Sequence, residues 1–385
     1  MRKEFLSFAS PRLEEDEIQE VVDSLRSGWL TRGPKVAKFE EDFKNYVHAG
    51  FACAVNSCTA ALHLSLVVAG IKSGDEVITT PFTFAATVST IIHSGATPVF
   101  VDVHPKTMNI DPSKIEEKIT KHTKAIIPVH FAGRPCDMDA IHAIAKKYNL
   151  IVIEDAAHAT GAQYHGKMVG SMSDFTAFSF YVTKNLITGE GGMVTTHNKE
   201  YAEKIGVYSL HGMSQDAWKR YADSKPKYYE IVYPGFKYNM MDTQAALGLH
   251  QLKKQEKFLL RREEIWKEYN EAFSGLPFET PADPEPNTRH ARHLYTMVLD
   301  MEKLGYSRDE FQMKMHAKNI GTSVHFISLH LHPYYREKLG FKKDDFPNAA
   351  MLSERIVSLP FTPKLTDNDV DDVIGAVKEI ICEVR

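Results

Sequence analysis

The chain has 385 residues, 43% of them hydrophobic, which is enough for one large domain with a smaller attachment. Its formal net charge is −4 with basic and acidic residues interspersed, which argues against a nucleic-acid partner. The four cysteines lack the paired spacing of a zinc site or a disulfide framework. The N-terminus has no signal-peptide core and no apolar run could span a bilayer, so we expect a cytoplasmic protein with no membrane partner.

Two amphipathic helices are predicted at the start of the chain. Each repeats apolar residues at helical spacing, and Gly28 ends the first helix. The segment 29–34 between them is read as a turn. The apolar positions are Ile18, Val21, Val22 and Leu25 in the first helix, and Val36, Phe39, Phe43 and Val47 in the second.

From Phe51 onward, short apolar runs alternate with helical stretches, which favours parallel strands joined by crossover helices. The predicted fold class is therefore α/β, with a large, mostly parallel, seven-stranded sheet. Strands are expected near 51–55, 76–79, 98–102, 125–130, 150–154, 175–180 and 192–197. Helices are expected near 59–69, 84–94, 113–121 and 137–148.

The pattern changes after about Pro234. A long charged helix near 243–273 repeats an apolar residue every seven positions, at Leu252, Leu259, Trp266 and Phe273, which suits a helix lying along another surface. We predict a large α/β domain over 1–248 and a small α+β domain over 249–385. The small domain would contain strands near 293–300 and 322–327, and helices near 308–318, 347–356 and 366–383.

Two buried runs end in single charged groups. Asp155 closes one run and Lys184 follows the other. Ligands of open α/β sheets bind outside the carboxyl ends of the strands. A buried Asp155 needs a partner, either a cofactor ring nitrogen or an Arg or Lys. A desolvated Lys184 would be nucleophilic toward an aldehyde, whereas a surface lysine would have no such role.

Further polar and aromatic residues follow the strand ends. Ser57-Cys58-Thr59 begins a helix and could bind an anion such as phosphate, or could be an ordinary cap. Phe82 or Phe84 could lie flat on a bound ring, or both could be core residues. The histidines near 325–332 lack the carboxylate or cysteine ligands that would complete a metal site, so no metal is expected.

Taken in the order in which they occur along the chain, these motifs resemble those of the fold-type I pyridoxal-phosphate enzymes, specifically the DegT/StrS-type sugar-nucleotide aminotransferases. The resemblance covers nearly the whole chain, although relatives often have glycine at the position of Cys58. Within the family, the chain most resembles enzymes that aminate 4-keto sugars, such as the one making UDP-4-amino-4-deoxy-arabinose. This closer resemblance is carried by the stretches 211–213, 216–218 and 235–239. The matching stretches are 27–34, 56–64, 81–87, 154–159, 178–185, 189–192, 235–240, 321–326 and 358–360.

The resemblance implies roles for single residues. Lys184 would attach covalently to pyridoxal 5'-phosphate and transfer protons, and Asp155 would pair with its ring nitrogen. Asn239 would reach the phosphate bound by a neighbouring subunit, so a homodimer with shared sites is implied. The remaining cofactor contacts would be Cys58 (through its amide), Thr59, Phe84, His158 and Ser179, and the substrate contacts would be Thr31, Tyr181 and His325.

The implied reaction transfers an amino group from L-glutamate to a nucleotide-linked keto sugar for amino-sugar or polysaccharide biosynthesis. Two alternatives remain at this stage. One is a sugar dehydratase on the same scaffold, although such relatives carry histidine where this chain has Lys184. The other is a non-catalytic regulator that binds the cofactor or a sugar nucleotide.

Overall fold

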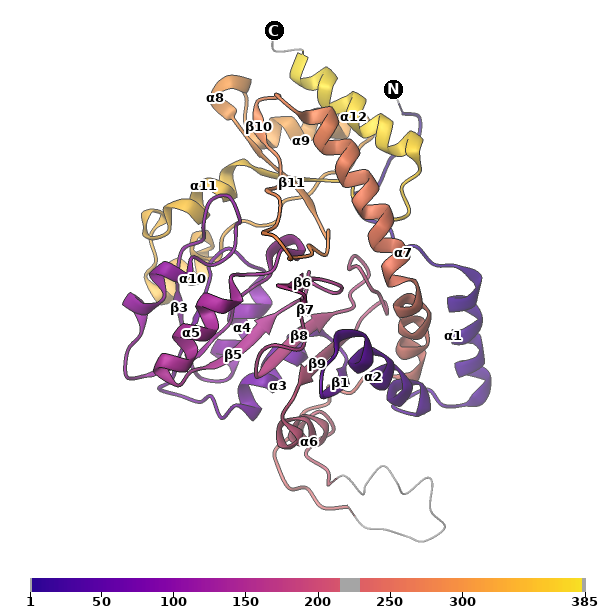
Figure 1. The fold of residues 1–385 in the computed structure, drawn as a ribbon, viewed down its shortest axis with the longest axis vertical. Coiled ribbons are helices and arrows are strands. Elements are labelled where there is room, and N and C mark those ends of the chain that lie inside the picture. The colour runs from indigo at the N-terminus through magenta and orange to yellow at the C-terminus, as the bar shows by residue number, and fades with distance from the viewer. Residues whose placement is uncertain (1, 215–228, 383–385) are drawn as a thin grey trace.

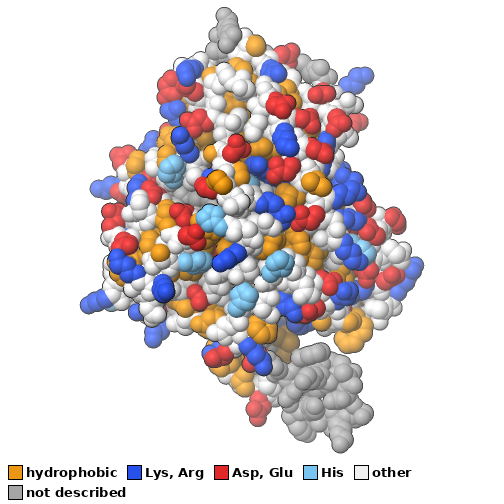
Figure 2. All heavy atoms as spheres, viewed as in Figure 1, with side chains coloured by type: hydrophobic (Ala, Val, Ile, Leu, Met, Phe, Trp, Pro, Cys, Tyr) orange, Lys and Arg blue, Asp and Glu red, His pale blue; other side chains and the backbone are white. Residues whose placement is uncertain are grey.

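The computed structural model describes residues 2–214 and 229–382 (Figure 1). Residues 216–218, which contribute to the resemblance to 4-keto sugar enzymes, lie outside these ranges. On the face seen in Figure 2, acidic and basic side chains are interspersed. Within the described residues, no helix is both long enough and apolar enough to cross a membrane.

The large sheet has seven strands in the order β1-β9-β8-β5-β4-β2-β3. The pairs from β8 through β5, β4 and β2 to β3 are parallel, and β9 runs antiparallel to both of its neighbours, β8 and β1. The predicted fold class is confirmed. The strands are β1 (Phe51–Val55), β2 (Glu76–Thr79), β3 (Thr97–Phe100), β4 (Thr123–Ile126), β5 (Ile151–Asp155), β8 (Phe175–Ser179) and β9 (Gly192–Thr196).

Helices cover both faces of this sheet, which explains why strands β5, β8 and β9 are buried at nearly every position. One face packs against α3 (Cys58–Val68) and α6 (Lys199–Tyr208), with α4 (Ala85–His93) beside α3. The other face packs against α2 (Pro34–Val47), α5 (Met138–Tyr148) and the first part of α7.

Helix α7 (Asp242–Phe273) extends from the large sheet to a second, three-stranded antiparallel sheet (Figure 1). All four of its seven-residue repeat positions are buried. Leu252 belongs to the core under the large sheet, whereas Trp266 and Phe273 belong to the core of the small sheet. The domain boundary at 248/249 stays a prediction. The small sheet consists of β10 (Phe278–Glu279), β11 (Tyr295–Leu299) and β12 (Ile356–Leu359).

The N-terminal segment also contacts the part of the chain around the small sheet, because Leu6 forms a bridge with Ile320. Helix α1 (Glu15–Ser27) then packs along α7, and both termini lie at the end of the molecule that holds the small sheet (Figure 1). The remaining elements are the β6–β7 hairpin (Gln163–Tyr164 and Lys167–Met168), α8 (Met301–Leu304), α9 (Arg308–Ala317), α10 (Pro333–Leu339), α11 (Pro347–Arg355) and α12 (Asp367–Cys382).

Two predicted elements are wrong. The helix expected near 113–121 is a pair of single 3-10 turns, Pro112–Lys114 and Glu116–Lys118. The strand expected near 322–327 makes, among the described residues, a single isolated bridge, from Ser323 to Ser358 of β12, and the 324–326 segment lines a cavity instead of extending this pairing. Strand β12 was missed because its four residues directly follow a helix.

Candidate active site

A cavity of about 600 Å³ opens at the carboxyl ends of β5 and β8. Its wall also includes the first turn of α3, the residues before α4 and the 324–326 segment. Most of the predicted site residues meet here; those that line it are Cys58, Thr59, Phe84, Asp155, His158, Ser179, Tyr181, Lys184 and His325.

Asp155 is the buried carboxylate at the end of β5, with only 5% of its surface exposed. Its Oδ1 accepts a hydrogen bond from the Ala157 amide at 3.1 Å, and its Oδ2 accepts one from Thr87 Oγ1 at 2.7 Å. Burial raises the pKa of Asp155 despite these bonds. No Arg or Lys in the described residues forms an ion pair with it, so its charge is left for a group bound in the cavity.

The neighbouring Glu154 does have a partner. The ring of His130 accepts the Cys136 amide at Nδ1, which leaves Nε2 to donate to Glu154 Oε2 at 2.7 Å. Burial acts to raise the pKa of Glu154, but the bond from His130 and its companions hold the pKa below its usual value. Two successive carboxylates on β5 therefore have different environments, and only Asp155 lines the cavity.

Lys184 lies in the turn after β8, where its amide donates to the Tyr181 carbonyl at 2.8 Å. Burial lowers the pKa of its ammonium to about 8, although Cys58 and Asp155 act in the opposite direction. With this pKa, roughly a tenth of Lys184 is a neutral amine at pH 7, far more than for an ordinary lysine, and the neutral amine is the form that attacks carbonyl carbon.

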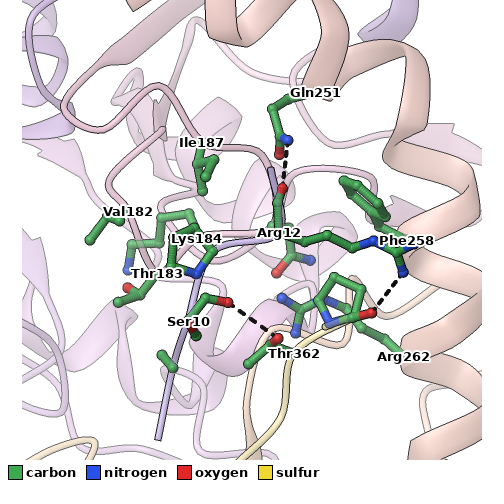
Figure 3. A pocket seen from close by; sticks show the side chains of 14 residues that line it. Ser10, Arg12, Val182, Thr183, Lys184, Ile187, Gln251, Phe258, Arg262 and Thr362 are labelled. Carbon is green, nitrogen blue, oxygen red and sulfur yellow. Dashed lines mark hydrogen bonds between the residues drawn. The ribbon is translucent and has the colours of Figure 1, made fainter. Parts of the chain in front are cut away.

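Behind Lys184, a second cavity of about 20 Å³ is enclosed by the N-terminal segment, α7 and residues 362–363 (Figure 3). Gln251 donates to the Arg12 carbonyl at 3.0 Å, and Arg12 in turn donates to the Pro363 carbonyl at 3.1 Å. The sequence did not predict this second wall behind Lys184, which is formed by three segments far apart in the chain.

The start of α3 presents backbone amides to the cavity. Ser57 caps the helix by accepting the Ala60 amide at 3.1 Å, while the Cys58 thiol points to the Ala177 carbonyl at 3.6 Å. The backbone amide of Cys58 is therefore available to a ligand in the cavity, because first-turn amides have no partner within their helix. Gly192 packs directly behind: a Cβ there would lie 2.5 Å from the Ser57 carbonyl carbon.

The two phenylalanines before α4 have opposite environments. Phe82 is fully buried and packs against Phe131 with ring centroids 5.2 Å apart. Phe84 is 65% exposed and lines the cavity. Of the two, Phe84 is the one whose ring is open to a ligand.

The two cavity histidines are held neutral. His158 Nδ1 accepts the Ala132 amide at 3.3 Å, so Nε2 carries the proton, and its ring lies 4.4 Å from that of His293. Burial keeps the pKa of His158 well below its usual value. Burial also lowers the pKa of His325 to about 4, and its Nδ1 bonds Ser358 Oγ at 2.9 Å.

Thr31 and Asn239 do not line the cavity of their own chain. The backbone of Asn239 pairs with Val55, and its buried Oδ1 has no hydrogen-bond partner in the described part of the chain. The Thr31 carbonyl accepts the Asp242 amide at 3.0 Å, so Thr31 lies beside the segment that contains Asn239. Their predicted contacts, with the substrate for Thr31 and with a neighbouring subunit's cofactor phosphate for Asn239, stay predictions.

Taken together, the cavity fits a flat aromatic ring with an anionic arm. The backbone amides at the start of α3 could bind the anion, and Phe84 could stack on the ring. The Asp155 carboxylate could pair with a cationic ring nitrogen, and Lys184 could react as a neutral amine. Within the described residues, no group of histidine, cysteine, aspartate and glutamate side chains could hold a metal ion.

Comparison with known proteins agrees with this geometry. Residues 11–378 match the model of the DegT/DnrJ/EryC1/StrS aminotransferase family. The chain is 53% identical over 381 residues to the spore coat polysaccharide biosynthesis protein SpsC of Bacillus subtilis, covering 99% of this chain and 98% of that protein.

Solved structures of sugar aminotransferases are also similar to this chain. Spr1654 of Streptococcus pneumoniae, assigned as a sugar aminotransferase, matches in its PMP form with a TM-score of 0.91 and 35% identity, over 99% of this chain and 98% of that one. Its PLP form matches with a TM-score of 0.90. Helicobacter pylori PseC, an aminotransferase of pseudoaminic acid biosynthesis, matches with a TM-score of 0.91 and 29% identity, covering 99% of this chain and 100% of PseC.

Proposed function

The chain belongs to the DegT/DnrJ/EryC1/StrS aminotransferase family, and we propose that it transfers the amino group of L-glutamate to the C4 keto carbon of a nucleotide-linked sugar. The observation that carries this proposal is the cavity itself. A buried, unpaired Asp155 and a lysine whose pKa is lowered to about 8 line one cavity, together with a helix start suited to phosphate.

Pyridoxal 5'-phosphate is the cofactor, and when bound it acts as an electron sink for the carbon that loses a proton. In our proposal, the amides of Cys58 and Thr59 with Ser179 hold its phosphate. Phe84 covers the ring face, and Asp155 pairs with the ring nitrogen. His158, whose Nε2 carries a proton, donates to the ring hydroxyl.

Lys184 has two tasks in the proposed reaction. It would hold the cofactor covalently between turnovers, its neutral amine being the form that attaches, and once released, its Nζ would take up the proton that the substrate carbon loses and pass it on. A pKa of about 8 suits both tasks, because the amine gains and loses protons readily near neutral pH. His325, neutral and near the mouth, together with Tyr181, would contact the sugar.

A homodimer with shared sites completes the proposal. Thr31 is exposed on the single chain, which suits a residue at a subunit interface, whereas Asn239 has a buried Oδ1 and would have to turn its side chain outward to reach the cavity of a partner. Exposed apolar side chains accompany them: Trp29 and Leu30 precede Thr31, Met241 follows Asn239, and 43–47% of each is accessible on the single chain. Such apolar exposure is typical of an interaction surface.

SpsC is named for polysaccharide biosynthesis, which supports an amino sugar destined for a polysaccharide as the product. The nucleotide linkage of the sugar and the cytoplasmic location predicted from the sequence are part of the proposal.

The amino donor is tested with glutamate alone. We expect L-glutamate to replace the absorbance band of the lysine-bound cofactor by that of the amine form, with one 2-oxoglutarate released per site. Excess 2-oxoglutarate should restore the original band. A spectrum that glutamate leaves unchanged would rule out glutamate as the donor.

A further inference from the structure

Thr87 is a fully buried hydroxyl that the proposed reaction does not yet use. It lies in the first turn of α4, one helical turn after Phe84. Its Oγ1 donates to Asp155 Oδ2 at 2.7 Å, across 68 residues of sequence. Thr87 itself does not line the cavity, so it would act on a bound ligand only through Asp155.

A second hydroxyl extends this contact. Thr83 Oγ1 lies 2.8 Å from Thr87 Oγ1, and Thr83 lines the cavity. When Asp155 is ionised, the Thr87 proton is committed to the carboxylate, so the Thr83 hydroxyl must donate to Thr87. Hydrogen bonds in such a chain polarise one another, which strengthens the final bond to the carboxylate.

The geometry leaves Asp155 with defined free acceptor sites. A carboxylate offers about four lone-pair positions. Thr87 occupies one on Oδ2 and the Ala157 amide occupies one on Oδ1, so rotation of the carboxylate would break both bonds. Because Asp155 lines the cavity, its remaining lone pairs are available to a ligand there.

We propose that Thr87, supported by Thr83, is a positioning residue that keeps the Asp155 carboxylate ionised and aimed at the ring nitrogen of the cofactor. The proposal rests on the cofactor pose of the proposed function. Burial raises the pKa of Asp155, and the bond from Thr87 is the strongest influence that opposes this rise. Without Thr87, a larger fraction of Asp155 would be protonated at neutral pH and unable to pair with a protonated ring nitrogen.

The test compares the affinity of the cofactor-free protein for pyridoxal phosphate in three variants, between pH 6.5 and 9. Thr87→Val keeps the shape but removes the hydroxyl, and Thr87→Ser restores the hydroxyl. Thr79→Val is the matched control, because the equally buried Thr79 donates at 2.8 Å to the Ile127 carbonyl and does not contact Asp155.

We expect Thr87→Val to weaken cofactor binding about tenfold at pH 7, the scale of one hydrogen bond to a charged group. The deficit should shrink as the pH rises, because a higher pH favours the ionised form of Asp155 in the variant as well. The other charged or titratable groups that interact with Asp155, namely Lys184, His130, Cys58 and Cys136, are common to all variants and cancel in the ratio. Thr87→Ser should recover most of the affinity, and Thr79→Val should bind as the unaltered protein does.

Unchanged affinity in Thr87→Val would overturn the proposal. So would a loss that is constant with pH, is not restored by serine, or is shared by Thr79→Val, since each would indicate a merely structural role. Failure of the unaltered protein to bind pyridoxal phosphate would instead count against the proposed function.

Discussion

Replacing Lys184 by alanine is expected to abolish amino transfer, with a loss on the order of 10⁵-fold or more, the scale seen when a covalent nucleophile is removed. The reason is that Lys184 both holds the cofactor and moves the proton. Borohydride treatment followed by peptide mass analysis should find the cofactor on Lys184 in the unaltered protein. It should find no labelled peptide in the variant, which still binds the cofactor noncovalently.

The matched control is Lys199→Ala, because the Lys199 side chain is 74% exposed at the start of α6, away from the cavity. It should leave activity and labelling unchanged. Full activity in the Lys184→Ala variant would remove Lys184 from the reaction.

Replacing Asp155 by asparagine should produce the second largest effect. The amide has almost the same shape but no charge, so the ring nitrogen would lose its anionic partner in a buried place. Breaking a buried charge pair costs roughly 3–5 kcal/mol, which corresponds to a fall in kcat of about 10²- to 10⁴-fold. The measurement is kcat at saturating cofactor.

Asp174→Asn is the control for this substitution. Asp174 accepts the Val152 amide at 2.9 Å near the opposite end of β5 and does not line the cavity that contains Asp155 and Lys184. It should keep a normal kcat even if its stability falls. Equal losses in the two variants would mean that Asp155 matters only for folding.

The sequence predicts the large sheet well because its strands are short apolar runs separated by helices of clear period. It also predicts which strand ends matter, since Asp155 and Lys184 are conspicuous charged residues after buried runs. The residues alone left the choice between Phe82 and Phe84 open, because both follow the same strand; the family resemblance pointed to Phe84, and in the structure Phe84 is the exposed one of the two.

Other parts of the site depend on contacts between distant segments. Thr87 bonds Asp155, and Arg12 closes the wall behind Lys184 with α7 and residues near Pro363. No local pattern marks such partners.

The predictions for two short elements failed for a different reason. β12 is four residues long and starts where α11 ends, so a helical pattern masked it. The 324–326 segment reads as a strand because Val324 and Phe326 alternate with His325. In the structure, these residues line the cavity instead of pairing with a neighbouring strand.

The central claim is that this cavity moves nitrogen from glutamate to a sugar. The most direct measurement incubates the holoenzyme with ¹⁵N-glutamate and a panel of UDP-, dTDP- and GDP-linked keto sugars, and follows the label by mass spectrometry and NMR. We predict ¹⁵N on C4 of one sugar, with an equimolar amount of 2-oxoglutarate. No labelled sugar from any member of the panel, despite release of 2-oxoglutarate, would contradict a nucleotide-linked keto sugar as the acceptor.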